Sequence, residues 1–176
     1  ADTYKVPRIA FINKMDIMGA NFFMTVDQIE HRLGKNPVCI QLPIGKENDF
    51  KGIIDLVEMQ AYIYNGNKGD DISITDIPEE LKDEADEWHQ KMVEQICGLD
   101  EELMEKYLEG EEPSIDELKR VLRKGTCENN AVPVCCGSAH FNKGIQKLLD
   151  AVIEYMPSPL DIPAIKGWTL DGEEDE

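Results

Sequence analysis

The stretch PRIAFINKMDIMG, residues 7–19, joins a short apolar run to an abrupt polar ending. The apolar run over 9–12 is typical of a strand buried in a sheet. Asn13, Lys14 and Asp16 follow directly, so an amide, an ammonium and a carboxylate stand where the strand ends. Polar groups in that place indicate a binding site, and they prompt a search for its other side.

A second stretch of the same kind, AVPVCCGSA, covers residues 131–139. Its apolar part, 131–136, predicts another buried strand that ends in small residues. A helical pattern with one apolar stripe follows over 145–156. Ligands in doubly wound α/β folds bind at the carboxyl ends of neighbouring parallel strands. We therefore predict an α/β fold, part of a doubly wound sheet, in which both stretches border one site.

The residues between these two strands predict a mixture of strands and helices. Apolar residues at helical spacing are followed by Gly34, which is typical of a helix end. Capping boxes are predicted at Asp76–Glu79 and Ser114–Glu117. The predicted elements are a helix over 22–33, strand-like residues over 36–45, two strands over 52–66, a loop over 66–71, and helices over 76–98, 100–110 and 114–125.

The N-K-x-D pattern of residues 13–16 suits a guanine base. The Asp16 carboxylate can accept two parallel hydrogen bonds, from guanine N1–H and from the 2-amino group. Adenine has neither donor at those positions, and a site built for such bonds rejects the analogue that lacks them. The methylene stem of Lys14 can lie along the base, and Asn13 can tie the neighbouring loops together and touch the base edge.

The other side of the predicted guanine site is Gly137-Ser138-Ala139 with the following His140. The backbone N–H groups of Ser138 and Ala139 can donate to guanine O6, which adenine replaces with a donor. Gly137 leaves room for a close approach. Three fixed residues in a four-residue window occur by chance in roughly 2% of chains of this length, so the pairing of the two stretches strengthens the prediction.

Other chemistries have weaker support in the sequence. The five cysteines are an odd number without a C-x-x-C pair, which favours reduced thiols. A zinc site of Cys135, Cys136 and His140 is disfavoured because adjacent residues of a strand point to opposite faces. The histidines show no metal-ligand spacing. No apolar stretch is long enough to span a membrane, and the first residues do not have the pattern of a signal peptide.

The net charge of −18 is concentrated in two places. Residues 79–112 hold 14 acidic and 3 basic residues, and residues 171–176 carry a further −5. So acidic a surface argues against a direct nucleic-acid site. It fits either a basic protein partner or a solubilising role, and on charge alone we favour the latter.

Several stretches together carry a family resemblance: VPRIAFINKMDIMGANFF, NPVCIQLPIG, DFKGIIDLVEMQAYIY, DEELMEKYLEGEE and VPVCCGSAHFNKGIQKLLDAVIEYMPSPLDIP. They closely resemble bacterial or organellar elongation factor G, a translational GTPase. The resemblance implies that residues 13–16 and 137–139 are the fourth and fifth GTPase motifs. It implies a GTPase domain over 1–35 and 129–156, an inserted α+β subdomain over 36–128, and a linker with the start of another domain over 157–176.

The resemblance also implies partners and a compartment. GTP or GDP would be the ligand, and the protein would act on the ribosome in the cytoplasm or an organellar matrix. The acidic insertion helices would contact the stalk protein of the large ribosomal subunit, which shifts the interpretation of their charge toward partner binding. The predicted guanine site then comprises Asn13, Lys14, Asp16, Ser138, Ala139 and His140.

The sequence contains no G-x-x-x-x-G-K-[ST] loop, no D-x-x-G followed by a catalytic histidine, and no switch threonine for Mg²⁺. Phosphoryl transfer depends on those parts. We therefore expect a fragment that covers the C-terminal, base-recognition half of a GTPase domain with its insertion, without Mg²⁺ ligands or catalytic residues. The alternatives are another translational GTPase of the ribosomal protection or release type, a non-enzymatic ribosome-binding module, or an acidic α/β domain whose N-K-M-D is accidental.

Overall fold

The computed structural model describes residues 2–66, 68–161, 167–168 and 174–175. Three strands form a parallel sheet in the order β1-β7-β2, and four form an antiparallel sheet in the order β3-β4-β5-β6. The strands are β1 (Ala10–Ile12), β2 (Pro37–Cys39), β3 (Gln41–Ile44), β4 (Gly52–Asp55), β5 (Gln60–Asn65), β6 (Asp71–Thr75), β7 (Val132–Cys136), β8 (Gly167–Trp168) and β9 (Glu174–Asp175). The helices are α1 (Phe22–Leu33), α2 (Glu79–Cys97), α3 (Glu101–Leu108), α4 (Ile115–Cys127) and α5 (Ile145–Tyr155), with 3-10 turns at Asp2–Tyr4, Glu47–Asp49 and Pro159–Asp161.

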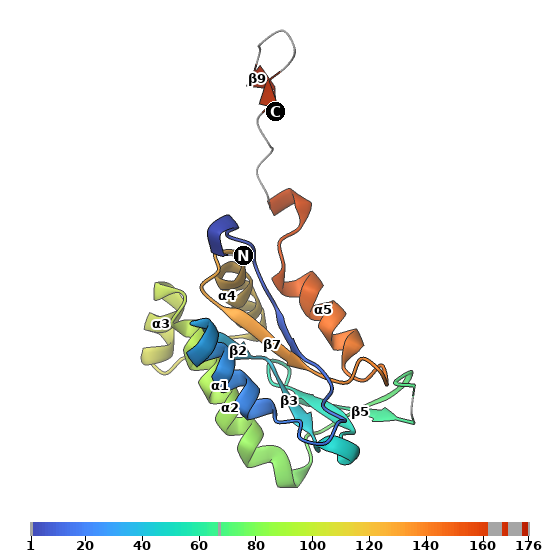
Figure 1. The fold of residues 1–176 in the computed structure, drawn as a ribbon. Helices are drawn as coiled ribbons and strands as arrows, with labels where there is room; N and C mark the ends of the chain where they lie inside the picture. Colours follow the sequence, from blue (N-terminus) through green and yellow to red (C-terminus); the bar gives the residue numbers. More distant parts are fainter. Residues whose placement is uncertain (1, 67, 162–166, 169–173, 176) are drawn as a thin grey trace.

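The parallel sheet confirms the predicted α/β class and brings the two polar stretches together. Ile12 lies opposite Cys136 in the β1–β7 register, so the two strands end side by side. All five residues of β7 are buried, as expected for a central parallel strand covered on both faces. Figure 1 shows the helices arranged accordingly, with α1 and α5 on opposite sides of these strands.

The ends of α1 follow the sequence closely. Asn21 caps its first turn by accepting a hydrogen bond from the backbone N–H of Met24. Gly34 ends the helix in the left-handed conformation, with φ of 59°, as the glycine predicts. The loop after β1 therefore leads directly into α1, and α1 packs on β2.

The antiparallel sheet contains one strand that the sequence analysis missed. β6 pairs with β5, from Asp71 opposite Asn65 to Thr75 opposite Ala61. Its residues are half-buried or exposed, since it lies at the edge of the sheet, so its apolar pattern is weak. The predicted loop over 66–71 is correspondingly shorter than expected, and the chain returns as a hairpin.

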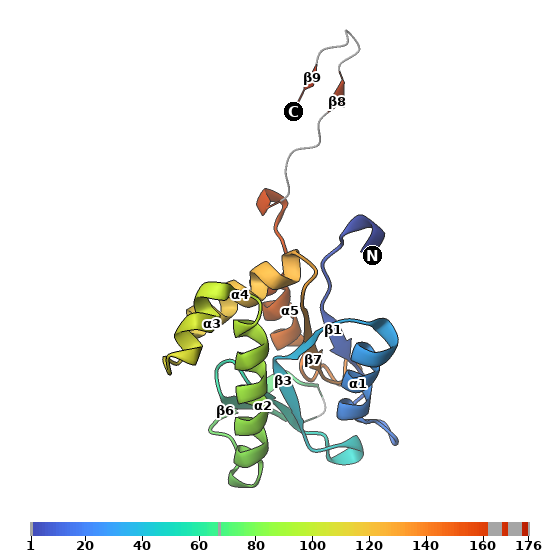
Figure 2. The ribbon, with the colours of Figure 1, turned by 90° about the vertical axis from the view of Figure 1, so that its left-hand side faces the viewer.

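The acidic helices form where they were predicted, but one local prediction was wrong. Pro78 stands at the N-cap of α2 without a side-chain cap, so the capping box predicted from Asp76 does not form. In α3, Leu103 is buried and Met104 and Tyr107 pack against the core, whereas Leu108 is 76% exposed. Figure 2 shows α2 in front of the sheets, with α3 and α4 toward its end.

The stripe predicted on α5 is only partly buried. Ala151 and Tyr155 are the buried residues of this helix, whereas Leu149, Val152 and Ile153 are exposed. Spacing identified the helix correctly but not which part of its apolar surface meets the sheet.

The proposed division into a GTPase part and an insertion remains a prediction. β2 lies inside the predicted insertion, yet it pairs with β7 in the same sheet as β1. That pairing favours a boundary after residue 39 instead of before residue 36. The linker predicted from residue 157 onward lies mostly outside the described residues.

The capping box at the start of α4 should make stability depend on pH. Glu117 accepts hydrogen bonds from the backbone N–H and hydroxyl of Ser114, and Lys106 is 3.2 Å away. These groups, the Ser114 backbone first, lower the pKa of Glu117 to about 2. Because this pKa is lowered on folding, the stabilisation is present above about pH 4.5 and is lost as the pH falls toward 2.

The measurement is the free energy of unfolding between about pH 5 and about pH 2. Glu117→Gln should reduce the decline of the free energy of unfolding with falling pH. Asp116→Asn, at the neighbouring exposed residue, should leave this decline unchanged. Equal slopes for all three proteins would contradict the role given to Glu117.

Candidate functional site

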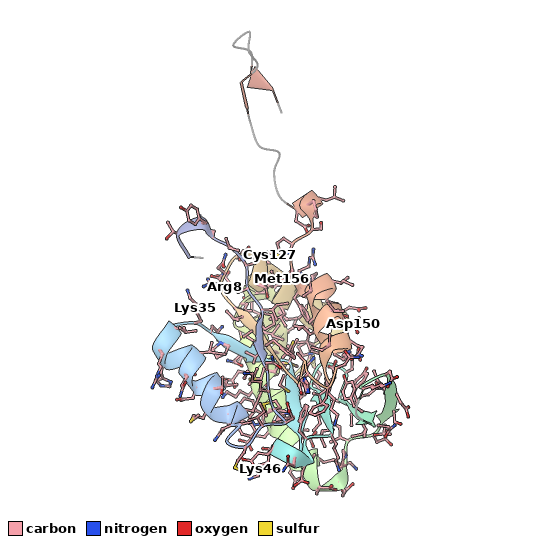
Figure 3. The ribbon with its side chains drawn as sticks, turned by 45° about the vertical axis from the view of Figure 1, so that its right-hand side comes forward. Arg8, Lys35, Lys46, Cys127, Asp150 and Met156 are labelled. Atoms are coloured by element: carbon pink, nitrogen blue, oxygen red, sulfur yellow. The ribbon has the colours of Figure 1, made fainter. Side chains whose placement is uncertain are left out.

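The site is built where β1 and β7 end. The backbone N–H of Gly137 donates to Ile12 O at 3.0 Å, and the N–H of Met15 donates back to Gly137 O at 3.1 Å. Met15 is 2% exposed and anchors the loop in the core. Figure 3 marks this end of the molecule by Lys46, opposite the end at which Arg8 lies. Two loops about 120 residues apart in the chain are thus joined by main-chain hydrogen bonds.

Asn13 ties the two loops together through its side chain. Its Oδ1 accepts from the backbone N–H of Lys14 at 2.8 Å and from that of Ala139 at 3.0 Å. The bond to Ala139 crosses from one polar stretch to the other, so the predicted tying role of Asn13 is confirmed. Lys14 itself is exposed and adopts φ of 65°, which turns the chain sharply toward Met15.

Two polar atoms in these loops are buried without a partner among the described residues: Asp16 Oδ1 and Ser138 Oγ. Ser138 is fully buried, and Asp16 is half-buried. A buried carboxylate oxygen or hydroxyl with no hydrogen bond is costly, and native structures usually satisfy it with a ligand, an ion or water. The donor set that a guanine offers, two N–H groups side by side, fits an acceptor such as Asp16.

The backbone groups predicted to reach guanine O6 already have acceptors in this conformation. Ser138 N–H donates to Lys143 O at 2.9 Å, and Ala139 N–H donates to Asn13 Oδ1. Contact with O6 would require one of these bonds to be exchanged, so this role stays a prediction. His140 is exposed, and its ring packs edge-on against Phe141 with centroids 4.8 Å apart.

Gly137 has a packing role in addition to the one predicted, which stays a prediction. A Cβ there would lie 2.3 Å from Lys143 O and 2.8 Å from the ring of Phe11. The glycine therefore allows the 137–143 turn to close on itself and on β1. Close packing within the protein is sufficient to explain it.

A group of residues that were not predicted as part of the site holds both loops from outside. They lie in the turn after β3 and the turn after β5, and they come from the antiparallel sheet. Lys143 Nζ donates to Phe50 O at 3.2 Å, and Asn142 Nδ2 donates to Lys68 O at 3.2 Å. Glu47 holds the other loop. Nothing in their local sequence pattern signals this, because the contacts exist only once the two sheets meet.

The zinc site of Cys135, Cys136 and His140 gains no geometric support among the described residues. Cys135 and Cys136 are buried, and burial raises the pKa of Cys135 to about 12 and that of Cys136 well above its ordinary value. Within the described ranges no group of three or more His, Cys, Asp or Glu side chains is placed to hold a metal ion. Helices long and apolar enough to cross a membrane are likewise missing from the part of the chain that the structure describes.

Comparison with known proteins agrees with this architecture. The family model of the elongation factor Tu GTP binding domain matches residues 1–158. Elongation factor G of Thermotoga maritima is 58% identical over 174 residues, covering 98% of this chain and 25% of that protein. Elongation factor G of Thermotoga petrophila is 56% identical with the same coverage.

A crystal structure of ttk003000868 from Thermus thermophilus superimposes with a TM-score of 0.81 at 27% identity. It covers 92% of this chain, and the chain covers 24% of it. The chain thus spans about a quarter of the length of the relatives it matches. The parallel sheet and its flanking helices match the P-loop GTPase fold of those relatives. By this match over most of its length, the chain belongs to the elongation factor Tu GTP binding domain family, and its homologues are translational GTPases.

Proposed function

We propose that this chain supplies the guanine-recognition part of a ribosomal translocase of the elongation factor G type. The observation that carries the proposal is the buried, unpartnered Oδ1 of Asp16, among the described residues, beside loops that Asn13 joins. A guanine nucleotide would satisfy this oxygen by its N1–H and 2-amino groups. The remaining residues of the predicted site are Lys14, in the same loop as Asp16, and Ser138, Ala139 and His140, in the loop after β7.

The individual roles follow from the chemistry of each group. Asp16 would read the two donors of the base, and the exposed Lys14 would cover one of its faces. Asn13 holds Ala139 against the first loop and so sets the distance between the two sides of the site. Ser138 Oγ, which is fully buried, would support the site as a donor to the Asp16 carboxylate or to the base. None of these residues would contact the phosphates of the bound nucleotide.

The test compares nucleotides that differ only in the base. Competition of GDP, IDP and ADP against a fluorescent GDP should rank GDP first in the intact translational GTPase that contains this chain. IDP lacks the 2-amino group and should bind at least tenfold less tightly, the loss expected for one hydrogen bond to a charged acceptor. Asp16→Ala should abolish the preference of GDP over IDP. An unchanged preference in that variant would refute the assignment.

The 176-residue chain by itself should not hydrolyse GTP. Phosphate contacts supply much of the affinity and all of the positioning for phosphoryl transfer, and this sequence has no phosphate-binding loop motif. We expect weak or undetectable GDP binding by calorimetry and no phosphate release above background. A tight, Mg²⁺-dependent GDP complex of this chain would contradict the prediction, and the intact protein serves as the positive control.

We also propose a ribosomal partner for the acidic helices. Residues 40–128 would form the insertion subdomain, with α2 and α3 presenting most of the negative charge to the stalk protein of the large subunit. Seven of the nineteen residues of α2 are acidic, and Ala85, Met92 and Ile96 bury its opposite side. The acidic side chains of α2 are therefore exposed and do not pack in the core.

Binding to the C-terminal domain of that stalk protein should be detectable in a pull-down at low salt and should weaken at high salt. A variant with Glu80, Asp83 and Glu87 replaced by glutamine or asparagine should bind less, whereas the same change at Glu128 and Asp150 should not matter. Binding insensitive to salt would count against the acidic surface. The source reading frame separates the remaining alternatives, since a non-enzymatic module would lack a phosphate-binding loop anywhere in it.

A further inference from the structure

We propose that Glu47 is a positioning residue that sets the base specificity of Asp16. Glu47 lies in the turn that follows β3 of the antiparallel sheet, 31 residues from Asp16 in the chain. This inference rests on the proposed guanine site and extends it to a residue outside both polar stretches. It links the antiparallel sheet to the part of the site that would discriminate between bases.

Glu47 contacts the 13–19 loop at two points, one on either side of Asp16. Its backbone N–H donates to Met15 O at 2.9 Å. Its side-chain Oε1 accepts from the backbone N–H of Gly19 at 2.8 Å. Glu47 thus bridges the loop segment that carries Asp16, from the buried Met15 to Gly19.

The conformation of Glu47 indicates that these contacts are strongly determined by the surrounding structure. It has φ of 52°, a left-handed conformation that costs free energy for any residue except glycine. Gly45, two residues earlier, has φ of 78°, and a Cβ there would lie 2.1 Å from Asp49 O. The turn is therefore tightly closed, and it presents both the amide and the carboxylate of Glu47 to the same loop.

Asp16 has no comparable support of its own. Its Oδ1 is unpartnered among the described residues, and the loop is otherwise held by Met15 N–H to Gly137 O and by short turns, Ile17 N–H to Lys14 O and Ala20 N–H to Ile17 O. A bidentate hydrogen bond demands a fixed carboxylate orientation. Loss of the Glu47 side chain should therefore loosen the aspartate while leaving the Met15 anchor in place.

The experiment measures the ratio of IDP to GDP dissociation constants in the intact protein, for variants at Glu47 and Asp16. Glu47→Gly suits the positive φ and keeps the amide, so it removes only the side-chain contact. We expect it to lower the preference for GDP over IDP by roughly threefold, less than the complete loss expected for Asp16→Ala, because the hydrogen bond from the 2-amino group is weakened and not removed. Glu47→Gln retains an acceptor oxygen and should keep most of the preference.

The matched control is Asp49→Ala, which removes a carboxylate from the same turn, and among the described residues no hydrogen bond of that carboxylate is seen. It should leave the ratio unchanged. In the same variants, amide exchange at Gly19 should accelerate for Glu47→Gly only, which tests the contact without any nucleotide.

The outcomes separate this inference from the function on which it rests. If Asp16→Ala leaves the IDP to GDP ratio unchanged, the guanine site itself is wrong. If Asp16→Ala removes the preference but Glu47→Gly does not, Glu47 has no positioning role. Equal weakening of GDP and IDP in Glu47→Gly would also overturn the inference, because it would show general loosening of the fold instead of misplacement of Asp16.

Discussion

Replacing Asp16 by asparagine should turn the preferred base from guanine to xanthine. The carboxylate is expected to accept from N1–H and the 2-amino group, whereas an asparagine amide donates where the 2-amino group would donate. Xanthine carries an oxygen at C2 and can accept that hydrogen bond. Guanine keeps the hydrogen bond from N1–H to the amide oxygen but loses the bond from its 2-amino group, whereas xanthine forms both. One bond lost by guanine and one gained by xanthine correspond together to roughly 3 kcal/mol, so GDP affinity should fall roughly 100-fold relative to XDP.

The measurement is competition of GDP and XDP against a fluorescent nucleotide in the intact protein. Asp83→Asn, an exposed aspartate on α2, provides the matched control and should leave GDP preferred. If Asp16→Asn still selected GDP over XDP, Asp16 would not be the group that reads the base. An equal loss for every nucleotide would indicate damage to the fold, which circular dichroism of the variant would reveal.

The second large effect concerns the buried ion pair that joins α5 to the antiparallel sheet. Lys147 Nζ lies 2.8 Å from Asp55 Oδ2 and 3.4 Å from Glu58 Oε2, and it stands over the Tyr62 ring at 4.7 Å. The side chains of Lys147 and Asp55 are 14% and 9% exposed. Burial favours the neutral amine, but the Asp55 carboxylate outweighs it and keeps the pKa of Lys147 above its ordinary value.

Lys147→Met should lower the free energy of unfolding by about 3–5 kcal/mol, because it leaves a buried carboxylate without its cation. The Asp55 side chain cannot simply turn to water, since its Oδ1 accepts from Val57 N–H and Glu58 N–H at 3.0 Å each. Urea unfolding monitored by circular dichroism measures the loss. The pair also holds the start of α5, just after the second loop of the site, against the antiparallel sheet.

Two further variants separate lost charge from lost packing. Asp55→Asn combined with Lys147→Met removes both charges and keeps an acceptor oxygen, so it should regain more than half of the loss. Lys119→Met removes a more exposed cation that bonds Glu58 and Glu154, and it should cost about 1 kcal/mol or less. A loss as small for Lys147→Met as for Lys119→Met would contradict the importance given to burial.

Local features of the chain were predictable where the residues that cause them lie within the same short stretch. The helix from Phe22 to Gly34 and the capping box from Ser114 to Glu117 formed as expected, because spacing, caps and a C-terminal glycine act within a few residues. The Asp76 cap failed because Pro78 occupies the N-cap and has no side-chain oxygen to accept from the first turn. The edge strand β6 was not predicted, because the two faces of a half-exposed strand differ little in their apolar content.

The sequence by itself determined the two polar stretches, the strands that precede them and the parallel sheet that brings them together. Each depends on a short apolar run that ends in polar or small residues, which is a property of neighbouring residues in the chain. It did not determine that Asn13 bonds Ala139, that Glu47 holds the Asp16 loop, or that Lys147 pairs with Asp55. Those contacts join residues 28 to 126 positions apart. Only the packing of the antiparallel sheet against α5 and the ends of β1 and β7 brings such groups within hydrogen-bond distance, since each bond needs both partners placed to within a few tenths of an ångström.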